Sequence, residues 1–408
     1  MSVAAALPSG QPDLPAGGVD SAAEARRSAP VRSDRRQALG AMLAGMAVGG
    51  GFAGLLVWAM GPHGILPAAS FRPAGGLAWA VTAVAAWLAA TLLHEGGHAA
   101  GAALGGFRLI ALWAGPLRIG RVDGRLRAGL NRRLAAWGGA CLSAPDRWPG
   151  DAAFRRGMWR YVAGGPAGSV AGSAACLAGA VAMSSPWALF LFVTGAMSLG
   201  LAVVTSIPMR MGGGTASDGL QLRRLRRRGA DDEAQLAIRA LLLLAQTQRP
   251  REWDAELAGR AEAAAGVSEL GAAASYLLYY RALDLGDWDA AREHLGRATE
   301  RAASGANGPA RAAQANAALE AAIFTAAWEN DAEAGRRWLD QASAARGADP
   351  QGWSLALAAI ARAEGKPPAD DLADAARAAR RTGIPSATLL RAATVERLSA
   401  DARRSAPA

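Results

Sequence analysis

Cysteine is nearly absent from this chain: 408 residues contain two, Cys141 and Cys176. Neither belongs to a C-x-x-C pair, so the sequence supports neither a disulfide framework nor a cysteine-based zinc site, and the redox compartment is left open. Histidine is also rare, with four residues in the chain. Any site built on imidazole therefore has few candidate residues.

Charged residues are scarce as well, at 19% of the chain against 51% apolar residues. This apolar content is higher than that of most soluble proteins. The scarcity is uneven, because long uncharged runs crowd into the first half, whereas charges alternate with Ala and Leu after Asp218. The pattern predicts a mainly α-helical fold, in which a polytopic membrane half precedes a soluble helical half.

The net charge of +10 does not indicate a nucleic-acid partner. The arginines cluster beside apolar runs, and no recognised nucleic-acid motif accompanies them. Charge that flanks membrane spans is the better interpretation. The expected partner of the first half of the chain is therefore the lipid bilayer, with no nucleic acid.

Four apolar runs, in which Glu95 and its two neighbouring histidines are the acidic and basic residues, are long enough to cross a hydrocarbon core of about 30 Å as helices. They are residues 38–60, 76–104, 161–183 and 187–208. Residues 1–36 are rich in Ala, Gly, Pro and Ser without an apolar period, which predicts a disordered cytoplasmic arm. Alternatively, Arg35-Arg36 and the first run form a cleaved signal, although the run is longer than the core of about 7 to 15 residues that signals have.

Arginine placement predicts how the spans are oriented. The arm, the segment 108–160 and the cluster Arg223–Arg228 are basic, and four spans put all three on one face. Basic loops stay in the cytoplasm, so we expect both termini there. The loop 61–73 has little charge, as an outside loop should. The expected location is a bacterial inner membrane.

The second run contains the sequence Leu93-His94-Glu95-Gly96-Gly97-His98. On a helix, residues four apart share a face, so both imidazoles can bind one ion while Glu95 reaches the attacking water. Polar residues inside an apolar span usually mark a functional site, because they are costly to insert. The pattern predicts a Zn²⁺ site, and the alternative is a pair of histidines hydrogen-bonded within a helix bundle.

Zinc needs a third protein ligand and an open position for water. His63 lies in the predicted outside loop and His294 in the soluble half, so neither is favoured. Asp218 follows the fourth run on the predicted cytoplasmic side and is our candidate. The alternative is a helix N-cap or turn aspartate that precedes Leu220.

These motifs resemble those of the site-2 protease family of membrane zinc metallopeptidases, over roughly Leu77 to Gln221. That family pairs an H-E-x-x-H span with a later Asp-Gly motif, here Asp218-Gly219, which supplies the third ligand. Two further elements are similar to those of the family: Gly165-Pro166-Ala167-Gly168-Ser169 and Ile207-Pro208. Ser169 and Thr205 stand where the family has Asn, and Ser217 stands where it has Leu.

The resemblance implies a mechanism and a class of substrate. Zn²⁺ on the two histidines and Asp218 would acidify a water, and Glu95 would accept its proton and protonate the leaving amine. The substrate would be a membrane-associated polypeptide, cut near the cytoplasmic face. The candidates for positioning it are Gly165, Pro166, Ser169 and Thr205.

Between the second and third runs, Phe107–Trp113 and Leu117–Ala128 contain strand-like stretches, and Asp123-Gly124 is a hairpin signal. A small β-hairpin beside the zinc could hold an extended substrate by main-chain pairing. A basic loop resting on anionic headgroups is an equal alternative.

Residues 229–408 predict a cytoplasmic, tetratricopeptide-like helical domain with a frayed tail. Aligning Gly286 with Asn330 superimposes Ala290 on Ala334 and Leu295 on Leu339, which is similar to the packing positions of such repeats. The alternative is an unrelated Ala-rich helical bundle. Repeat surfaces bind proteins, so a protein partner is possible here.

The sequence as a whole favours a zinc metallopeptidase, with its membrane domain at residues 37–228. Two other functions stay open. One is a non-catalytic membrane scaffold in which the helical repeats bind a partner, and the other is a zinc hydrolase that acts on something other than a peptide bond.

Overall fold

The computed structural model describes residues 76–122, 125–130, 138–183, 186–210, 216–227, 229–266, 270–303, 308–343, 349–382 and 385–404. Several predictions fall outside these residues: the arm 1–36, the span 38–60 with its signal alternative, the loop 61–73, the turn Asp123-Gly124 and His63. The described part is mainly helical, as predicted, and it contains one small antiparallel sheet where the sequence predicted a hairpin.

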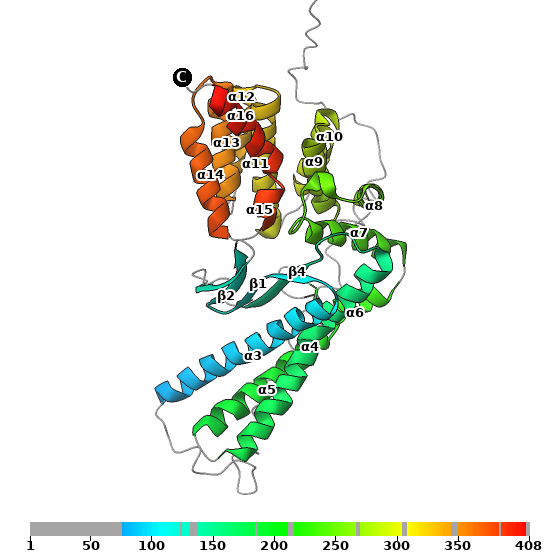
Figure 1. The fold of residues 1–408 in the computed structure, drawn as a ribbon, viewed down its shortest axis with the longest axis vertical. Helices are drawn as coiled ribbons and strands as arrows, with labels where there is room; N and C mark the ends of the chain where they lie inside the picture. The colour runs from blue at the N-terminus through cyan, green and yellow to red at the C-terminus, as the bar shows by residue number, and fades with distance from the viewer. Residues whose placement is uncertain are drawn as a thin grey trace, which may run out of the picture.

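Three helices form the lower part of the molecule in Figure 1: α3 (Gly76–Leu104), α4 (Asp151–Ala182) and α5 (Pro186–Ser206). Each is long and apolar enough to cross a membrane. Large apolar side chains along them face outward, such as Leu77, which is 80% exposed. Apolar side chains on the outside of a long helix suit contact with acyl chains, so the chain is membrane-associated.

The helix α4 begins at Asp151, whereas the sequence predicted a span from Tyr161. Arg155, Arg156 and Arg160 were assigned to a segment too charged to span, and they belong to the helix instead. These three arginines lie near the start of α4, before its apolar part, so their charges stay at one end of the helix. Arg155 donates to the carbonyl of Leu225, and Arg160 donates to the carbonyl of Leu104, so the helix continues past the apolar part.

Helices α3 and α4 cross with their backbones in contact. A Cβ added to Gly97 would lie 2.3 Å from the carbonyl oxygen of Gly164, and one added to Gly101 would lie 2.2 Å from that of Arg160. Only glycine leaves room for this approach. The crossing brings the C-terminal half of α3, with its histidines, against α4.

The sheet follows α3 directly. Its strands are β1 (Arg108–Ala114), β2 (Leu117–Val122), β3 (Arg125–Leu130) and β4 (Gly139–Ala144), in the order β3-β2-β1-β4 with every neighbour antiparallel. Val122 pairs with Arg125, so β2 and β3 form the predicted hairpin. The sequence missed β4, which pairs with β1 and lies against α3.

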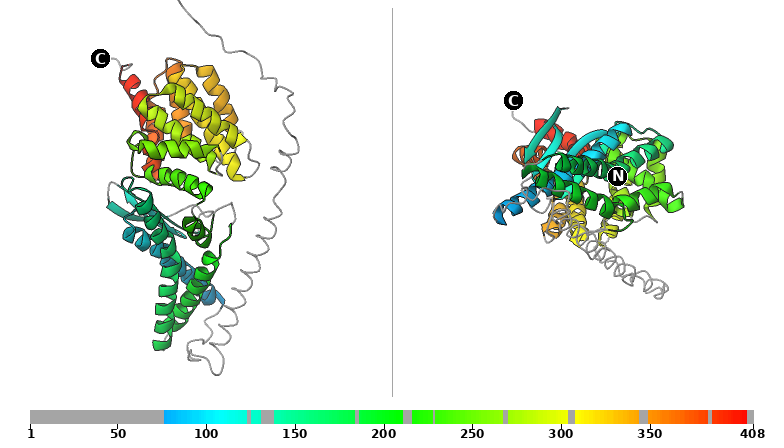
Figure 2. Two further views of the ribbon diagram at one scale, coloured as in Figure 1. Left: turned by 90° about the vertical axis from the view of Figure 1, so that its right-hand side faces the viewer. Right: turned by 90° about the horizontal axis from the view of Figure 1, so that it is seen from below.

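The remaining helices form the upper part of the molecule (Figure 2). They are α6 (Asp218–Arg226), α7 (Ala230–Leu244), the 3₁₀ helix η4 (Pro250–Glu252), α8 (Ala255–Ala265), α9 (Gly271–Leu285), α10 (Trp288–Ala303), α11 (Gly308–Trp328), α12 (Ala332–Ser343), α13 (Pro350–Ala363), α14 (Ala369–Thr382), α15 (Pro385–Leu389) and α16 (Ala392–Arg404). Consecutive helices pack as the hairpins α9/α10, α11/α12 and α13/α14.

Two of these hairpins turn in the same way. Gly286 and Asn330, which the sequence alignment matched, both have left-handed backbones, with φ of 80° and 57°. The next residue, Asp287 or Asp331, then caps the following helix by accepting from the amide of Ala290 or Ala334. The two turns are therefore alike in structure, whereas a tetratricopeptide-like domain remains a prediction.

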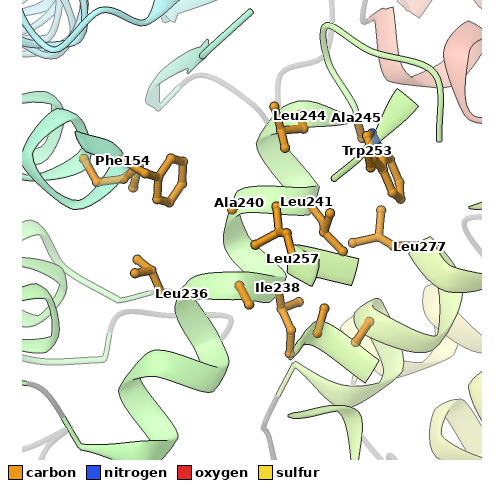
Figure 3. Close-up of a cluster of buried hydrophobic side chains, with 14 of the residues drawn as sticks. Phe154, Leu236, Ile238, Ala240, Leu241, Leu244, Ala245, Trp253, Leu257 and Leu277 are labelled. Carbon is orange, nitrogen blue, oxygen red and sulfur yellow. The ribbon is translucent and has the colours of Figure 1, made fainter. Parts of the chain in front are cut away.

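One hydrophobic core joins the membrane helices to the upper helices (Figure 3). Phe154 of α4 and Phe107, just before β1, belong to the same cluster as Leu241 of α7 and Leu257 of α8. Arg155 of α4 also pairs with Glu233 of α7 at 2.6 Å. The two sides of the predicted boundary at residue 228 thus share one core, and the boundary itself stays a prediction.

Candidate metal centre

Three buried side chains meet where α3, α4 and α6 converge. His94 Nε2 lies 3.2 Å from one carboxylate oxygen of Asp218, and His98 Nε2 lies 3.6 Å from the other. One ligand atom from each residue lies within 4.8 Å of the others. The structure thus brings together the three predicted metal ligands from two helices far apart in the sequence.

Each histidine is held through its other ring nitrogen. His94 Nδ1 lies 2.9 Å from the hydroxyl of Ser169, and His98 Nδ1 lies 2.9 Å from the carbonyl oxygen of Tyr161. Because a carbonyl only accepts, Nδ1 of His98 carries a hydrogen. Contacts of this kind orient the rings of metal ligands and leave Nε2 to face the ion.

Asp218 is the first residue of α6, and the preceding Ser217 is the N-cap. The Ser217 hydroxyl accepts from the amides of Leu220 and Met209 and donates to the carbonyl of Ile207. The N-cap alternative for Asp218 is therefore wrong, because Ser217 satisfies the helix terminus. The Asp218 carboxylate is left to face the histidines.

The Asp218 carboxyl is ionised at neutral pH. Its burial by itself would raise its pKa, but hydrogen bonds from His94 and His98, together with their charges, outweigh burial and hold the pKa at about 2. Cys141 on β4 behaves differently, because burial raises the pKa of its thiol to about 11. A protonated thiol is a poor metal ligand, so the donor set consists of two imidazoles and a carboxylate.

Two of the donor distances are close to those around a tetrahedral ion. Zinc binds imidazole nitrogen and carboxylate oxygen at about 2.0–2.2 Å, which puts neighbouring ligand atoms about 3.4 Å apart. The nitrogen–oxygen distances of 3.2 and 3.6 Å, which run to different oxygens of Asp218, lie on either side of that value, and all three ligand atoms lie within 4.8 Å of one another. The cluster of His94, His98 and Asp218 could therefore hold a metal ion.

A cavity of about 520 Å³ opens beside the three ligands. Glu95, 7% exposed, lines it together with the ligands. Its carboxylate lies against the first residue of β4, because a Cβ on Gly139 would stand 2.2 Å from Glu95 Oε1. A buried carboxylate thus lies next to the candidate metal ligands at a cavity large enough for part of a polypeptide.

The four residues predicted to position substrate lie in different places. Thr205 lines the cavity, is 8% exposed, and its hydroxyl has no hydrogen-bond partner among the described residues. Ser169 is fully buried behind His94. Gly165 makes room for His98, since a Cβ there would lie 2.3 Å from the ring, and Pro166 is half-buried inside α4.

Sequence reasoning missed Tyr161 and the first residues of β4. Tyr161 orients His98 through its carbonyl and donates its hydroxyl to the carbonyl of Cys141, which ties α4 to β4. Gly139 and Cys141 line the cavity. Nothing in the sequence signalled these contacts, because a short Gly- and Ala-containing strand has little periodicity and main-chain acceptors leave no motif.

Comparisons of this chain with protein-family models, with curated proteins and with solved structures find no match. The donor set, its burial and its cavity are therefore the observations from which a function can be argued.

Proposed function

We propose that this protein is a membrane-embedded zinc metallopeptidase of site-2 protease type. One observation supports the proposal above others: the H-E-x-x-H residues of α3 and Asp218 of α6 converge on one cavity, with Glu95 beside them. A carboxylate next to a His, His, Asp donor set is the arrangement of metal-assisted hydrolysis.

In this proposal His94, His98 and Asp218 hold the metal, and Ser169 and Tyr161 keep the two rings in place. Zinc, when bound, would acidify water and polarise a carbonyl group. Glu95 accepts a proton from the attacking water and later protonates the leaving amine, so that one carboxylate serves both steps.

The substrate we propose is an extended segment of a membrane-associated polypeptide. β4 lies at one edge of the sheet, and its residues Gly139 and Cys141 line the cavity. A segment that pairs with this edge would run past Glu95, which is the geometry of strand addition. The hydroxyl of Thr205, which has no partner within the part of the chain that the structure describes, lies on the α5 side of the cavity and would donate to a substrate carbonyl.

The proposed setting is the cytoplasmic side of a bacterial inner membrane. The sheet, the start of α4, α6 and the upper helices all lie at the same end of the three long helices (Figure 1). That end carries the arginines of β1 to β3 and of α6, and basic segments favour the cytoplasm. The upper helices would there meet a protein partner.

The proposal is tested by measuring the zinc content of the detergent-purified chain and its rate of peptide cleavage. We expect about one zinc per chain, loss of zinc in His94→Ala and Asp218→Ala, and retention in His294→Ala, whose histidine lies outside the site. Glu95→Gln should keep its zinc. Its rate of cleavage of a quenched fluorescent casein should fall about 100-fold or more.

Two outcomes contradict the proposal. A wild-type chain that binds no zinc after reconstitution cannot be this hydrolase, and the non-catalytic scaffold would then be favoured. A Glu95→Gln chain that cleaves at the wild-type rate would remove Glu95 from the chemistry.

A further inference from the structure

The last described helix, α16, lies across helices of three different hairpins. It packs against α9, α11, α13 and α14, and it belongs to none of the pairs α9/α10, α11/α12 and α13/α14 (Figure 1). These hairpins, the helical array, bury apolar residues against one another in two clusters, one between α9, α10 and α11 and one between α11, α12, α13 and α14. The second cluster also contains Leu398 of α16, so α16 completes a core that comes mostly from the hairpins.

Directly before α16, an arginine enters a closed polar pocket. Arg391, 6% exposed, donates to Glu320 Oε1 from Nε at 2.8 Å and from Nη2 at 2.6 Å. Its Nη1 donates to Asp349 and lies 3.5 Å from Gln351 Oε1. Glu320 is fully buried and comes from α11, while Asp349 and Gln351 come from the start of α13.

This pocket is shaped for a guanidinium group. Three nitrogens of Arg391 reach two carboxylates at once, which the compact ammonium of lysine does not do. Gly352 leaves space for it, because a Cβ there would stand 2.8 Å from Arg391 Nη2. Without the arginine, Glu320 would be a buried charge with no cation, which is strongly unfavourable.

The rest of α16 adds apolar contacts and a second arginine. Val395 and Leu398, four and seven residues after Arg391, pack into the core of α11 and α13. Val395 and Leu398 are three residues apart within α16, so they lie on one helix face. Arg397 donates to the carbonyl of Ala327 at 2.7 Å and lies over the ring of Trp328, 5.3 Å from its centre.

We infer that the segment Pro385–Arg404 is a built-in ligand of the helical array, and that the array recognises an amphipathic helix bearing one buried arginine. The partner it fits is a helical protein segment with arginine followed by aliphatic residues at the fourth and seventh positions. Such a segment takes the place of α15 and α16. A segment without the arginine does not, because Glu320 would stay buried and unpaired. The upper helices therefore have a closed, self-occupied state and an open, partner-bound state.

The test uses the full chain in detergent and a fluorescent synthetic peptide with the sequence of residues 385–404. Arg391→Ala weakens the chain's own ligand, so this variant should bind the peptide about tenfold or more tighter than wild type. In wild type the attached segment competes at an effective concentration on the order of millimolar. A control peptide with alanine at the position of Arg391 should bind the variant about tenfold more weakly.

Equal binding of the two peptides, or no binding by an Arg391→Ala chain that keeps its helical content, overturns the inference. Hydrogen exchange on the wild-type chain decides the matter if that variant does not fold. We expect amides of α16 to exchange about tenfold or more faster than those of α11 and α13, because a self-ligand opens locally. Exchange of all three helices at one rate would show that α16 is a permanent part of the core and would overturn the inference.

Discussion

The candidate metal site depends on small residues that leave room for its side chains. Gly139, at the start of β4, has no side chain where Glu95 and Thr91 approach it. The neighbouring Gly138 has open space at the same position. Two adjacent glycines thus differ in whether a methyl group would meet the proposed catalytic carboxylate.

Gly139→Ala should lower peptide cleavage about 100-fold while zinc content stays at the wild-type level. Its methyl group would stand 2.2 Å from Glu95 Oε1 and displace that carboxylate without touching the metal ligands. Gly138→Ala is the matched control and should keep full activity. Zinc analysis and cleavage rates on both variants check this, and an active Gly139→Ala chain would show that Glu95 can move freely.

At the scale of elements, the crossing of α3 over α4 positions both histidines. Gly97 faces the backbone of Gly164 and Gly168 at this crossing, whereas Gly96 faces open space. A methyl group at Gly97 must push the helices apart, because backbone atoms cannot rotate away.

Gly97→Ala should therefore destabilise the chain by about 1–3 kcal/mol and weaken metal binding. Gly96→Ala, one residue away in the same motif, should change neither. Thermal unfolding in detergent and zinc titration against a chelator measure the two effects. A Gly97→Ala chain as stable as Gly96→Ala would mean that the helices are not in contact there.

A buried histidine of α10, His294, gives the upper helices a pH dependence. Burial lowers the pKa of His294 on α10 below its ordinary value of 6.5, and the charge of Arg297 acts in the same direction against the opposing Glu262. The folded chain holds this histidine neutral, so below about pH 6.5 the unfolded chain binds the extra proton. Stability should fall as pH drops through this range.

His294→Gln should remove this component, since glutamine does not titrate. We expect the variant to lose less thermal stability than wild type between about pH 7 and pH 5. The melting temperature of each chain across that range is the measurement. Parallel curves for the two chains would assign the pH dependence to other groups.

At the scale of the whole molecule, the proposed catalytic half and the upper helices share one hydrophobic core. Phe107, Phe154 and Met158 pack against α7 and α8. The helix α6 connects the two sides, because Asp218 begins it and the carbonyl of Leu225 near its end accepts from Arg155. Movement of the upper helices would therefore be transmitted through α6 to Asp218 of the candidate metal site.

A chain that ends at residue 228 should fail to fold into a monomer that binds zinc. The cut would expose the apolar faces of Phe107 and Phe154 to water, and an exposed patch of this kind promotes aggregation. A chain that ends at Arg404 is the control and should behave as wild type. Size-exclusion chromatography and zinc content distinguish the two, and a stable zinc-binding fragment would show that the membrane half is an independent domain.

The sequence by itself identified the candidate metal ligands and predicted the kind of elements that carry them. The spacing of His94 and His98 needs no tertiary information, because four residues on a helix always share a face. Long apolar runs and the Asp123-Gly124 hairpin signal are also local features of the sequence, and they predicted α3, α5 and the pairing of β2 with β3.

Only the tertiary structure decided what surrounds those ligands. The contact of Ser169 with His94, the carbonyl of Tyr161 behind His98 and the approach of β4 to Glu95 join residues far apart in the chain. The start of α4 at Asp151 and the arginine pocket around Arg391 were equally hidden. Such contacts depend on how elements pack, and a side chain's partner across a helix crossing leaves no periodic trace in the sequence.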